Sequence, residues 1–381
     1  MSPVEQIPQV RSDELKQTVI TAHLEAALPP DTNVLYCASF QIAWNQLCDD
    51  VIRAPVQLKG HPAIGEALNK RMLDTDAIAE ECYLAMAGFG RDGIVARVIQ
   101  GLQEKFGHGP GLPLHPIEPE DILAYAYLEK SLPFDTWFEV INEPLRFSGG
   151  VPVQSFGVQT RYDAADQVFI LDYQGPDDFI LALGPSANAS VGLDRTLDEQ
   201  QYGRQVDASL LNSLLNRLRI TDEFVLAKVP PRATLLATLD GVMARPSEMA
   251  RSLLAKWLKG ELRRLHPDVG LSAHAEDVLQ IPMVNLNVLH RYSELIGQHL
   301  LNSGFTDYFV AEALQGVKFK LDERGAELRS EAKIELTFGA APEPRRFIFD
   351  GPFLLYLKEP QARYPYLALW IANSELLAKA P

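Results

Sequence analysis

The chain of 381 residues is long enough to form one large hydrophobic core or two of ordinary size. Hydrophobic residues make up 47 % of it and charged residues 22 %, which excludes a disordered chain. The net charge is −15, from 50 acidic and 35 basic residues, and without a dense Lys/Arg cluster this excludes a nucleic-acid partner.

The sequence also bears on the compartment. Its first residues lack the basic stretch and apolar run of a secretory signal. No apolar run reaches the length of about 18 residues that a membrane-spanning helix needs. The cysteines Cys37, Cys48 and Cys82 are few and odd in number, which is typical of reduced thiols. We therefore expect a soluble cytoplasmic protein with no membrane partner.

The N-terminal part is predicted to be mainly helical. Apolar residues at helical spacing predict helices over 13–28, 40–52, 66–73 and 93–106. Buried strands are expected over 33–37, 81–89 and 121–132. A connector rich in Gly and Pro over 107–116 precedes the last of them.

Strands dominate the rest of the chain. They are expected over 145–147, 151–158, 167–173, 179–183, 224–229, 233–239, 278–288, 346–356 and 366–371. Helices are expected over 207–219, 247–265 and 292–302. Because no linker separates the two parts, we predict a single α+β domain over 1–381.

The most regular pattern lies near the C-terminus. Apolar and polar side chains alternate over 317–321 and again over 326–338, and Asp322-Glu323-Arg324-Gly325 separates the two runs. This predicts two half-buried strands joined by a turn. The second strand would span roughly 43 Å, well beyond the usual length of a strand.

The sequence does not reveal a catalytic site. The sequence has no Gly-x-x-x-x-Gly-Lys-Ser/Thr phosphate-binding loop and no Gly-x-Ser-x-Gly, and its eight histidines are scattered. We therefore predict no catalytic residue, no metal and no cofactor, so the protein is not expected to be an enzyme. A cryptic enzyme would need a pocket of titratable groups with perturbed pKa values, which the sequence does not reveal.

The C-terminal features resemble those of the serpin superfamily of serine protease inhibitors. In that family a sheet strand leads into an acidic-acidic-basic-Gly turn, a reactive-centre loop and a Phe-x-x-Pro-Phe strand. Here Asp322 to Gly325 match the turn, and Phe349-Asp-Gly-Pro-Phe353 matches the later strand. Looser matches in the same order cover most of the chain.

The resemblance implies a serpin-like α+β fold with a large central sheet, smaller barrel-like sheets and helices packed mainly from the N-terminal part. The reactive-loop equivalent would cover about 326–346. Its hinge residues would be Glu323, Gly325, Ala326, Leu328, Arg329 and Ser330. The bond that a protease cuts would lie among Phe338, Gly339, Ala340 and Ala341.

Three departures from the family pattern bear on function. The helix that crosses the large sheet is missing, since only the Gly/Pro connector precedes 121–132. Gln315 stands where the family has a histidine beneath the sheet. Bulky Leu328 and charged Arg329 occupy a hinge that is built from small residues in inhibitory members.

These departures favour a non-inhibitory protein that binds a protease or another protein through the loop equivalent. The inward face of 326–336 would bury well as a strand, and Lys320 would then face Glu327, so the hairpin could form during folding. The alternative is an active mobile-loop inhibitor of a chymotrypsin-like protease (through Phe338) or an elastase-like one (through Gly339 to Ala341). A third interpretation is an ordinary long hairpin in an unrelated α+β fold.

Overall fold

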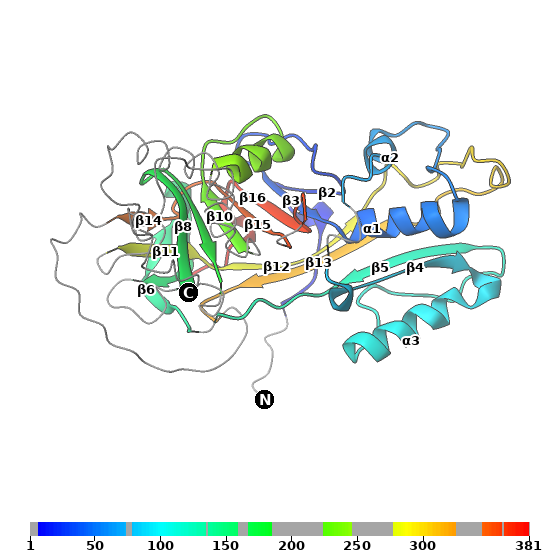
Figure 1. Ribbon diagram of the computed structural model, residues 1–381, viewed down its shortest axis with the longest axis horizontal. Helices are drawn as coiled ribbons and strands as arrows, with labels where there is room; N and C mark the ends of the chain where they lie inside the picture. The colour runs from blue at the N-terminus through cyan, green and yellow to red at the C-terminus, as the bar shows by residue number, and fades with distance from the viewer. Residues whose placement is uncertain are drawn as a thin grey trace, which may run out of the picture.

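The structure is a computed structural model that describes residues 7–73, 78–134, 136–158, 167–184, 224–245, 277–324, 345–359 and 362–380. Its described strands form four sheets (Figure 1). The helices α1, α2 and α3 and the strands β4 and β5 lie at one end of the molecule. The seven-stranded and four-stranded sheets lie at the other, and β12 and β13 extend between the two ends.

The seven-stranded sheet combines strands from both halves of the chain. Its order is β2-β3-β16-β15-β10-β9-β8. The strands are β2 (Thr18–Thr21), β3 (Asn33–Cys37), β8 (Val168–Gly175), β9 (Asp178–Leu183), β10 (Phe224–Lys228), β15 (Phe353–Leu357) and β16 (Leu367–Ile371). Every residue of β3, β10, β15 and β16 is buried, because both faces of this part of the sheet are covered.

Three smaller sheets complete the β structure. One has the order β1-β12-β13, with β1 (Val10–Arg11), β12 (Val284–Arg291) and β13 (Leu314–Leu321). The second has the order β14-β11-β7-β6, with β14 (Arg346–Ile348), β11 (Val278–Pro282), β7 (Pro152–Val158) and β6 (Glu139–Arg146). The third pairs β4 (Tyr83–Phe89) with β5 (Ile122–Leu128).

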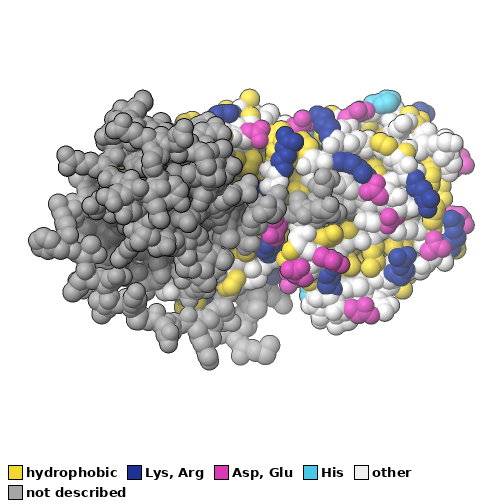
Figure 2. Space-filling model, viewed as in Figure 1, with side chains coloured by type: hydrophobic (Ala, Val, Ile, Leu, Met, Phe, Trp, Pro, Cys, Tyr) yellow, Lys and Arg dark blue, Asp and Glu magenta, His cyan; other side chains and the backbone are white. Residues whose placement is uncertain are grey.

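The helices of the N-terminal part pack on the two-stranded sheet. α1 (Ser39–Gln46), continued by a π-helical turn over Leu47–Ile52, packs against β4, β5 and β13. α3 (Ile94–Phe106) covers β4 and β5 with Ile94, Val98 and Leu102, which are fully buried at helical spacing. The short helix α2 (Ala63–Leu68) contacts α1. Figure 2 shows acidic and basic side chains interspersed over this end of the molecule.

The main hydrophobic core lies between the seven-stranded sheet, the four-stranded sheet and the strands β12 and β13. Phenylalanine rings fill much of it, with Phe179, Phe347, Phe349 and Phe353 in edge-on contacts. A second core cluster joins α1 and α2 to Tyr292 and Leu300.

The predicted α+β class, the large multistranded sheet and the N-terminal origin of the helices are confirmed. Residues 107–121 are all described and contain no helix. This agrees with the prediction that no helix crosses the sheet just before 121–132. The large sheet, however, is the one built around β16 and β15. The strand β13, which leads into the predicted hinge, lies in the three-stranded sheet.

Three predicted elements are wrong. Residues 13–28 form no long helix, because β-branched Thr18, Val19 and Ile20 pair as β2 in parallel with β3. Residues 292–302 form turns, and Gly297, with a φ of 78°, interrupts any helix there. The strand predicted over 233–239 is also wrong, because a helix covers 235–245. The predicted helices 207–219 and 247–265 and the second hairpin strand 326–338 lie outside the described residues.

Candidate functional site

The strand β13 leads directly into the predicted loop equivalent. Val317 and Leu321 are buried and Phe319 is half-buried, whereas Lys318 and Lys320 are exposed, so the alternation predicted from the sequence is confirmed. β13 pairs antiparallel with β12 along its whole length, from Leu314 opposite Arg291 to Leu321 opposite Val284. The side chain at each position of the hinge strand is therefore fixed by its register with β12.

The N-terminal end of the loop equivalent is attached to the segment that follows β5. The amide of Phe138 donates to the carbonyl of Glu323 at 2.9 Å, and the amide of Phe134 donates to the carbonyl of Arg324 at 3.3 Å. Phe134 and Phe138 are themselves buried in the main core with their rings in contact. The backbone at Glu323 and Arg324 is therefore fixed to the main core.

Side chains reinforce this first attachment. The guanidinium of Arg324 lies 4.9 Å from the ring centre of Trp137, a cation–π contact. Its Nε also lies 3.0 Å from Oε1 of Glu323. The carboxylate of Asp322 accepts the amide of Arg324 at 3.0 Å, which closes the turn.

The C-terminal end is held by an ion pair. Arg345 Nη2 lies 2.7 Å from Asp277 Oδ2, and Arg345 Nε lies 3.2 Å from both carboxylate oxygens. The amide of Arg345 donates to Asp277 Oδ1 at 2.8 Å, and its carbonyl accepts from Val278 at 2.9 Å. The side chain of Asp277 is only 3 % exposed, so this pair is largely shielded from water. Directly after it, β14 pairs in parallel with β11.

The strands β5 and β13 each have a free edge in the described part of the structure. β13 pairs with β12 on one side and β5 pairs with β4 on one side, and no strand pairing joins β5 to β13. Both strands pack on α1. Within the described residues, the two free edges therefore belong to strands that share one supporting helix.

Gln315 connects this part of β13 to the start of α1. It is 2 % exposed, and its Oε1 accepts from the hydroxyl of Tyr292 at 2.6 Å. Its Nε2 donates to the carbonyl of Cys37 at 2.8 Å and to Oγ of Ser39 at 3.0 Å. Burial raises the pKa of the Tyr292 phenol, which keeps it a neutral donor. The position where the family has a histidine thus carries a fully bonded amide.

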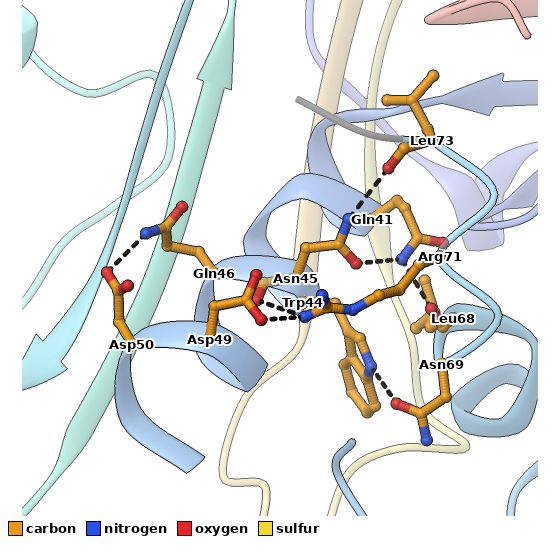
Figure 3. Close-up of polar contacts among 10 residues, drawn as sticks. All are labelled: Gln41, Trp44, Asn45, Gln46, Asp49, Asp50, Leu68, Asn69, Arg71 and Leu73. Atoms are coloured by element: carbon orange, nitrogen blue, oxygen red, sulfur yellow. Dashed lines mark hydrogen bonds and ion pairs between the residues drawn. The ribbon is translucent and has the colours of Figure 1, made fainter. Parts of the chain in front are cut away.

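The helix α1 is itself fixed by buried amide side chains (Figure 3). Gln41 Nε2 donates to Asn45 Oδ1 and to the carbonyl of Leu68, both at 2.8 Å. Asn45 Nδ2 donates to the carbonyl of Leu73 at 3.0 Å. These bonds attach α1 to the last residue of α2 and to the chain that follows, so the helix that supports β5 and β13 is held in place.

Of the site residues predicted from the sequence, the structure describes Glu323 alone. The hinge positions Gly325, Ala326, Leu328, Arg329 and Ser330 and the scissile candidates Phe338, Gly339, Ala340 and Ala341 lie outside the described residues. Sequence reasoning missed Trp137, Asp277 and Arg345. They are far apart along the chain, and no spacing rule connects them.

Metal-binding clusters and membrane-spanning helices are both absent from the part of the chain that the structure describes. There, no group of three or more His, Cys, Asp or Glu side chains could hold a metal ion. In the same ranges, no helix is long and apolar enough to cross a membrane.

Comparison with known proteins gives structural likenesses only. No protein-family model and no curated protein sequence matches the chain. The chain is similar in structure to Serpin48 of the insect Tenebrio molitor, with 11 % identity, 90 % and 92 % of the two chains covered and a TM-score of 0.40. It is similar to Arabidopsis AtSerpin1, with 11 % identity, 91 % and 93 % covered and a TM-score of 0.41. It is also similar to human thyroxine-binding globulin, with 12 % identity, 90 % and 92 % covered and a TM-score of 0.44.

The first two of these structures are serpins by name, the family that the C-terminal motifs of this chain resemble. The likeness extends over about nine-tenths of the chain and concerns the fold. The binding of thyroxine is a property of thyroxine-binding globulin and is not transferred to this chain.

Proposed function

We propose that this chain is a serpin-like protein that presents the segment 326–346 to a protein partner, or adds it to a sheet as a strand, without acting as an efficient suicide inhibitor. The partner would be a protease or another protein that recognises an extended segment. In this proposal the whole chain, 1–381, acts as a single domain.

The observation that carries this proposal is the pair of attachments around the segment. Glu323 and Arg324 hold one end to Phe134 and Phe138, and Arg345 holds the other end to Asp277. A segment with both ends fixed loses less conformational freedom when a partner binds it, because part of that entropy is already lost on folding.

The edges of β5 and β13 that have no strand partner among the described residues support the second part of the proposal. An unpaired strand edge offers backbone N–H and C=O groups to an added strand. The predicted strand 326–338 follows β13 directly, and its inward side chains, such as Leu328, Ile334 and Leu336, are apolar. Each would contribute roughly 1.5–3 kcal/mol if fully buried.

The hinge residues argue against efficient inhibition. A serpin-like inhibitor must insert its cleaved loop before the acylated protease is released, so insertion has to be fast. Leu328 and Arg329 are large where the sheet would have to open first, and Arg329 would have to keep its charge out of the core. The alternative, an active inhibitor of a chymotrypsin- or elastase-like protease, is favoured by Phe338 and by Gly339 to Ala341.

One mixing experiment separates the two. The protein is incubated with chymotrypsin-like, elastase-like, trypsin-like, subtilisin-like and papain-like proteases, and the products are followed by SDS gel and intact mass. We expect cleavage between Thr337 and Arg346, no SDS-stable complex and little change in melting temperature. An SDS-stable complex, with a large rise in the melting temperature of the cleaved form, would establish the inhibitory alternative.

Two variants locate the cleaved bond. Phe338→Ala should reduce chymotrypsin cleavage in the segment strongly, because it removes the side chain that fills the specificity pocket. Phe309→Ala is the matched control, since Phe309 is an exposed phenylalanine elsewhere, 56 % accessible. If all five proteases leave the segment 326–346 intact while cutting other sites, the segment is not presented to a protease, and only the form of the proposal in which it is added to a sheet as a strand survives.

A further inference from the structure

Both ends of the chain cover the outer edge of β12. One edge of β12 pairs with β13, and on the opposite edge Val288 and Leu289 pair with Val10 and Arg11 of β1. The beginning of β12 is covered from the other terminus, where Leu377 forms a β-bridge with Val284. The eight-residue strand is therefore shielded by short pieces of both termini.

The N-terminal piece runs from the three-stranded to the seven-stranded sheet. The Asn287 side chain donates to the carbonyl of Ile7 at 2.8 Å, and Ser12 Oγ lies 2.7 Å from Nδ1 of His290. After a turn, β2 joins the seven-stranded sheet beside β3. In Figure 1 the blue N-terminal segment passes beside β12 on its way to β2.

A single carboxylate joins this piece to the C-terminal one. Glu375 Oε1 accepts the amide of Lys16 at 2.8 Å, and Oε2 accepts the amide of Gln17 at 3.0 Å and the hydroxyl of Thr18 at 2.7 Å. Charge-assisted bonds of this kind are stronger than those between neutral groups. Asn373 adds a bond from its side chain to the carbonyl of Gln17 at 3.2 Å.

By contrast, the strand β1 itself is held weakly. It has two residues in a parallel pairing, Val10 is only half-buried and Arg11 is exposed. Such a short parallel pair contributes little by itself, because each net backbone hydrogen bond adds only a small stabilisation. Residues 7–17 are therefore attached at one end through Glu375, with further bonds from Asn33 and Asn373 to the carbonyl of Gln17, and at the other end through a few contacts with β12.

We propose that residues 7–17 form a releasable strap, fastened by Glu375, which protects the outer edge of β12 from pairing with a second copy of this chain.

The composition of β12 favours another copy as the occupant of the uncovered edge. Antiparallel pairing of two β12 strands about Val288 places Asn285 opposite Arg291 of the second copy and Leu286 opposite its His290. No two like charges then face each other across the two strands. The edge is the same on both copies, so one closed two-fold dimer forms. Because each copy carries a net charge of −15, the dimer should be favoured by salt, which screens the repulsion.

The test uses full-length protein and two variants that loosen the strap in different ways. Glu375→Ala removes the three-bond acceptor, and Val10→Pro removes a β1 amide while leaving every contact of Glu375 in place. The control is Asp13→Asn, which breaks the exposed ion pair of Arg11 with Asp13 and leaves Glu375 untouched. Hydrogen exchange by mass spectrometry and molar mass by light scattering are measured at several concentrations, at low and high salt.

In both test variants, exchange over 7–17 should become at least about tenfold faster, which corresponds to about 1.4 kcal/mol. The molar mass should rise toward the dimer with concentration and with salt, and 284–291 should regain protection in the dimer. Asp13→Asn should behave as the parent protein. Unchanged exchange over 7–17 in Val10→Pro overturns the strap. A released strap in a protein that stays monomeric throughout overturns the pairing with a second copy, as does a dimer in which 284–291 gains no protection.

Discussion

Arg345 and Asp277 meet as an ion pair in which the guanidinium contacts both carboxylate oxygens, although 68 positions separate them in the sequence. The same carboxylate also accepts the backbone amide of Arg345. The pair therefore fixes both the side chain and the main chain at the point where the chain enters β14. Since β14 has three residues and lies at the edge of its sheet, much of its attachment depends on this contact.

Replacing Asp277 with alanine should destabilise this attachment. The change leaves the Arg345 guanidinium, 16 % exposed, without its principal carboxylate, and breaking a buried pair in this way costs about 3 kcal/mol. Urea unfolding should show the loss, and hydrogen exchange should be faster over 345–348. Arg346→Ala, which changes the exposed neighbour on β14, is the control and should alter stability by less than about 0.5 kcal/mol. Equal effects of the two changes would contradict the role assigned to Asp277.

Replacing Gln315 with methionine should lower the free energy of unfolding, because the side-chain amide of Gln315 joins β13 to the start of α1. Methionine fills a similar volume but leaves the Tyr292 hydroxyl and the Cys37 carbonyl without their bonds to Gln315. Leaving a buried polar group unsatisfied costs about 1–3 kcal/mol. Tyr292→Phe and the double variant complete a mutant cycle. We expect the two changes to be clearly non-additive, because they remove the two partners of one bond, and additive effects would mean that the bond contributes nothing.

Replacing Asn45 with leucine tests the buried hydrogen bonds that hold α1, the helix on which β5 and β13 pack. The change removes the acceptor of Gln41 and the donor to the Leu73 carbonyl inside a buried network, and it should cost about 1–3 kcal/mol. Gln46→Leu is the matched control on the same helix, because the bond from Gln46 to Asp50 is exposed. Thermal unfolding should show a clear loss for the first variant and almost none for the second.

Acid should weaken the junction of the two chain ends. Burial opposes ionisation of Glu375, but the hydrogen bonds from Thr18, Lys16 and Gln17 outweigh it and hold the pKa of this carboxyl below its ordinary value. A carboxyl with a lowered pKa stabilises the folded state above its unfolded pKa. That contribution is lost as the pH falls through the folded pKa.

The measurement is the free energy of unfolding between neutral pH and the acid range below the ordinary pKa of glutamate. The parent protein should lose stability more steeply in acid than Glu375→Gln, because the variant has no carboxyl to protonate there. At neutral pH the variant should already be the less stable of the two. Parallel curves for the two proteins would show that Glu375 does not contribute to acid sensitivity.

Much of the fold could be predicted from local patterns in the sequence. The alternation along β13, the apolar stripe of α3 and the all-buried run Asn33–Cys37 each reflect an environment that repeats along one element. Such signals need no knowledge of distant residues. For the same reason the turn at Asp322 to Gly325 marked the end of β13 correctly.

The wrong predictions have two physical causes. One is a helix N-cap at a single residue, and the other is pairing with a strand that is distant in the sequence. The helix over 235–245 begins where Thr234 Oγ1 accepts the amide of Ala237, and Leu235, Leu239 and Val242 form its buried stripe. The stripe continues to Val242, beyond the residues 233–239 for which a strand is predicted. The segment 18–21 became a strand because β3 offered an edge next to it, which no local pattern reveals.

The attachments at the candidate site could not have been predicted from the sequence alone. Asp277 pairs with Arg345, and Trp137 pairs with Arg324, through the topology of different sheets. Arg345 lies at the C-terminal end of the predicted loop equivalent, and nothing in its local sequence predicts a partner for it. Its function as an anchor becomes visible only when β11 and β14 lie side by side.

The pairing of β3 with β16 determines at what stage of its synthesis this protein can complete its largest sheet. Leu35 lies opposite Leu369, and the side chain of Asn33 accepts the amides of Ala372 and Asn373. The two strands pair although 339 positions separate Asn33 from Ala372. During synthesis β3 must wait, without its antiparallel neighbour, until β16 has left the ribosome. Such long-range pairing makes folding slow, and an apolar strand that waits in this way depends on chaperones to avoid aggregation.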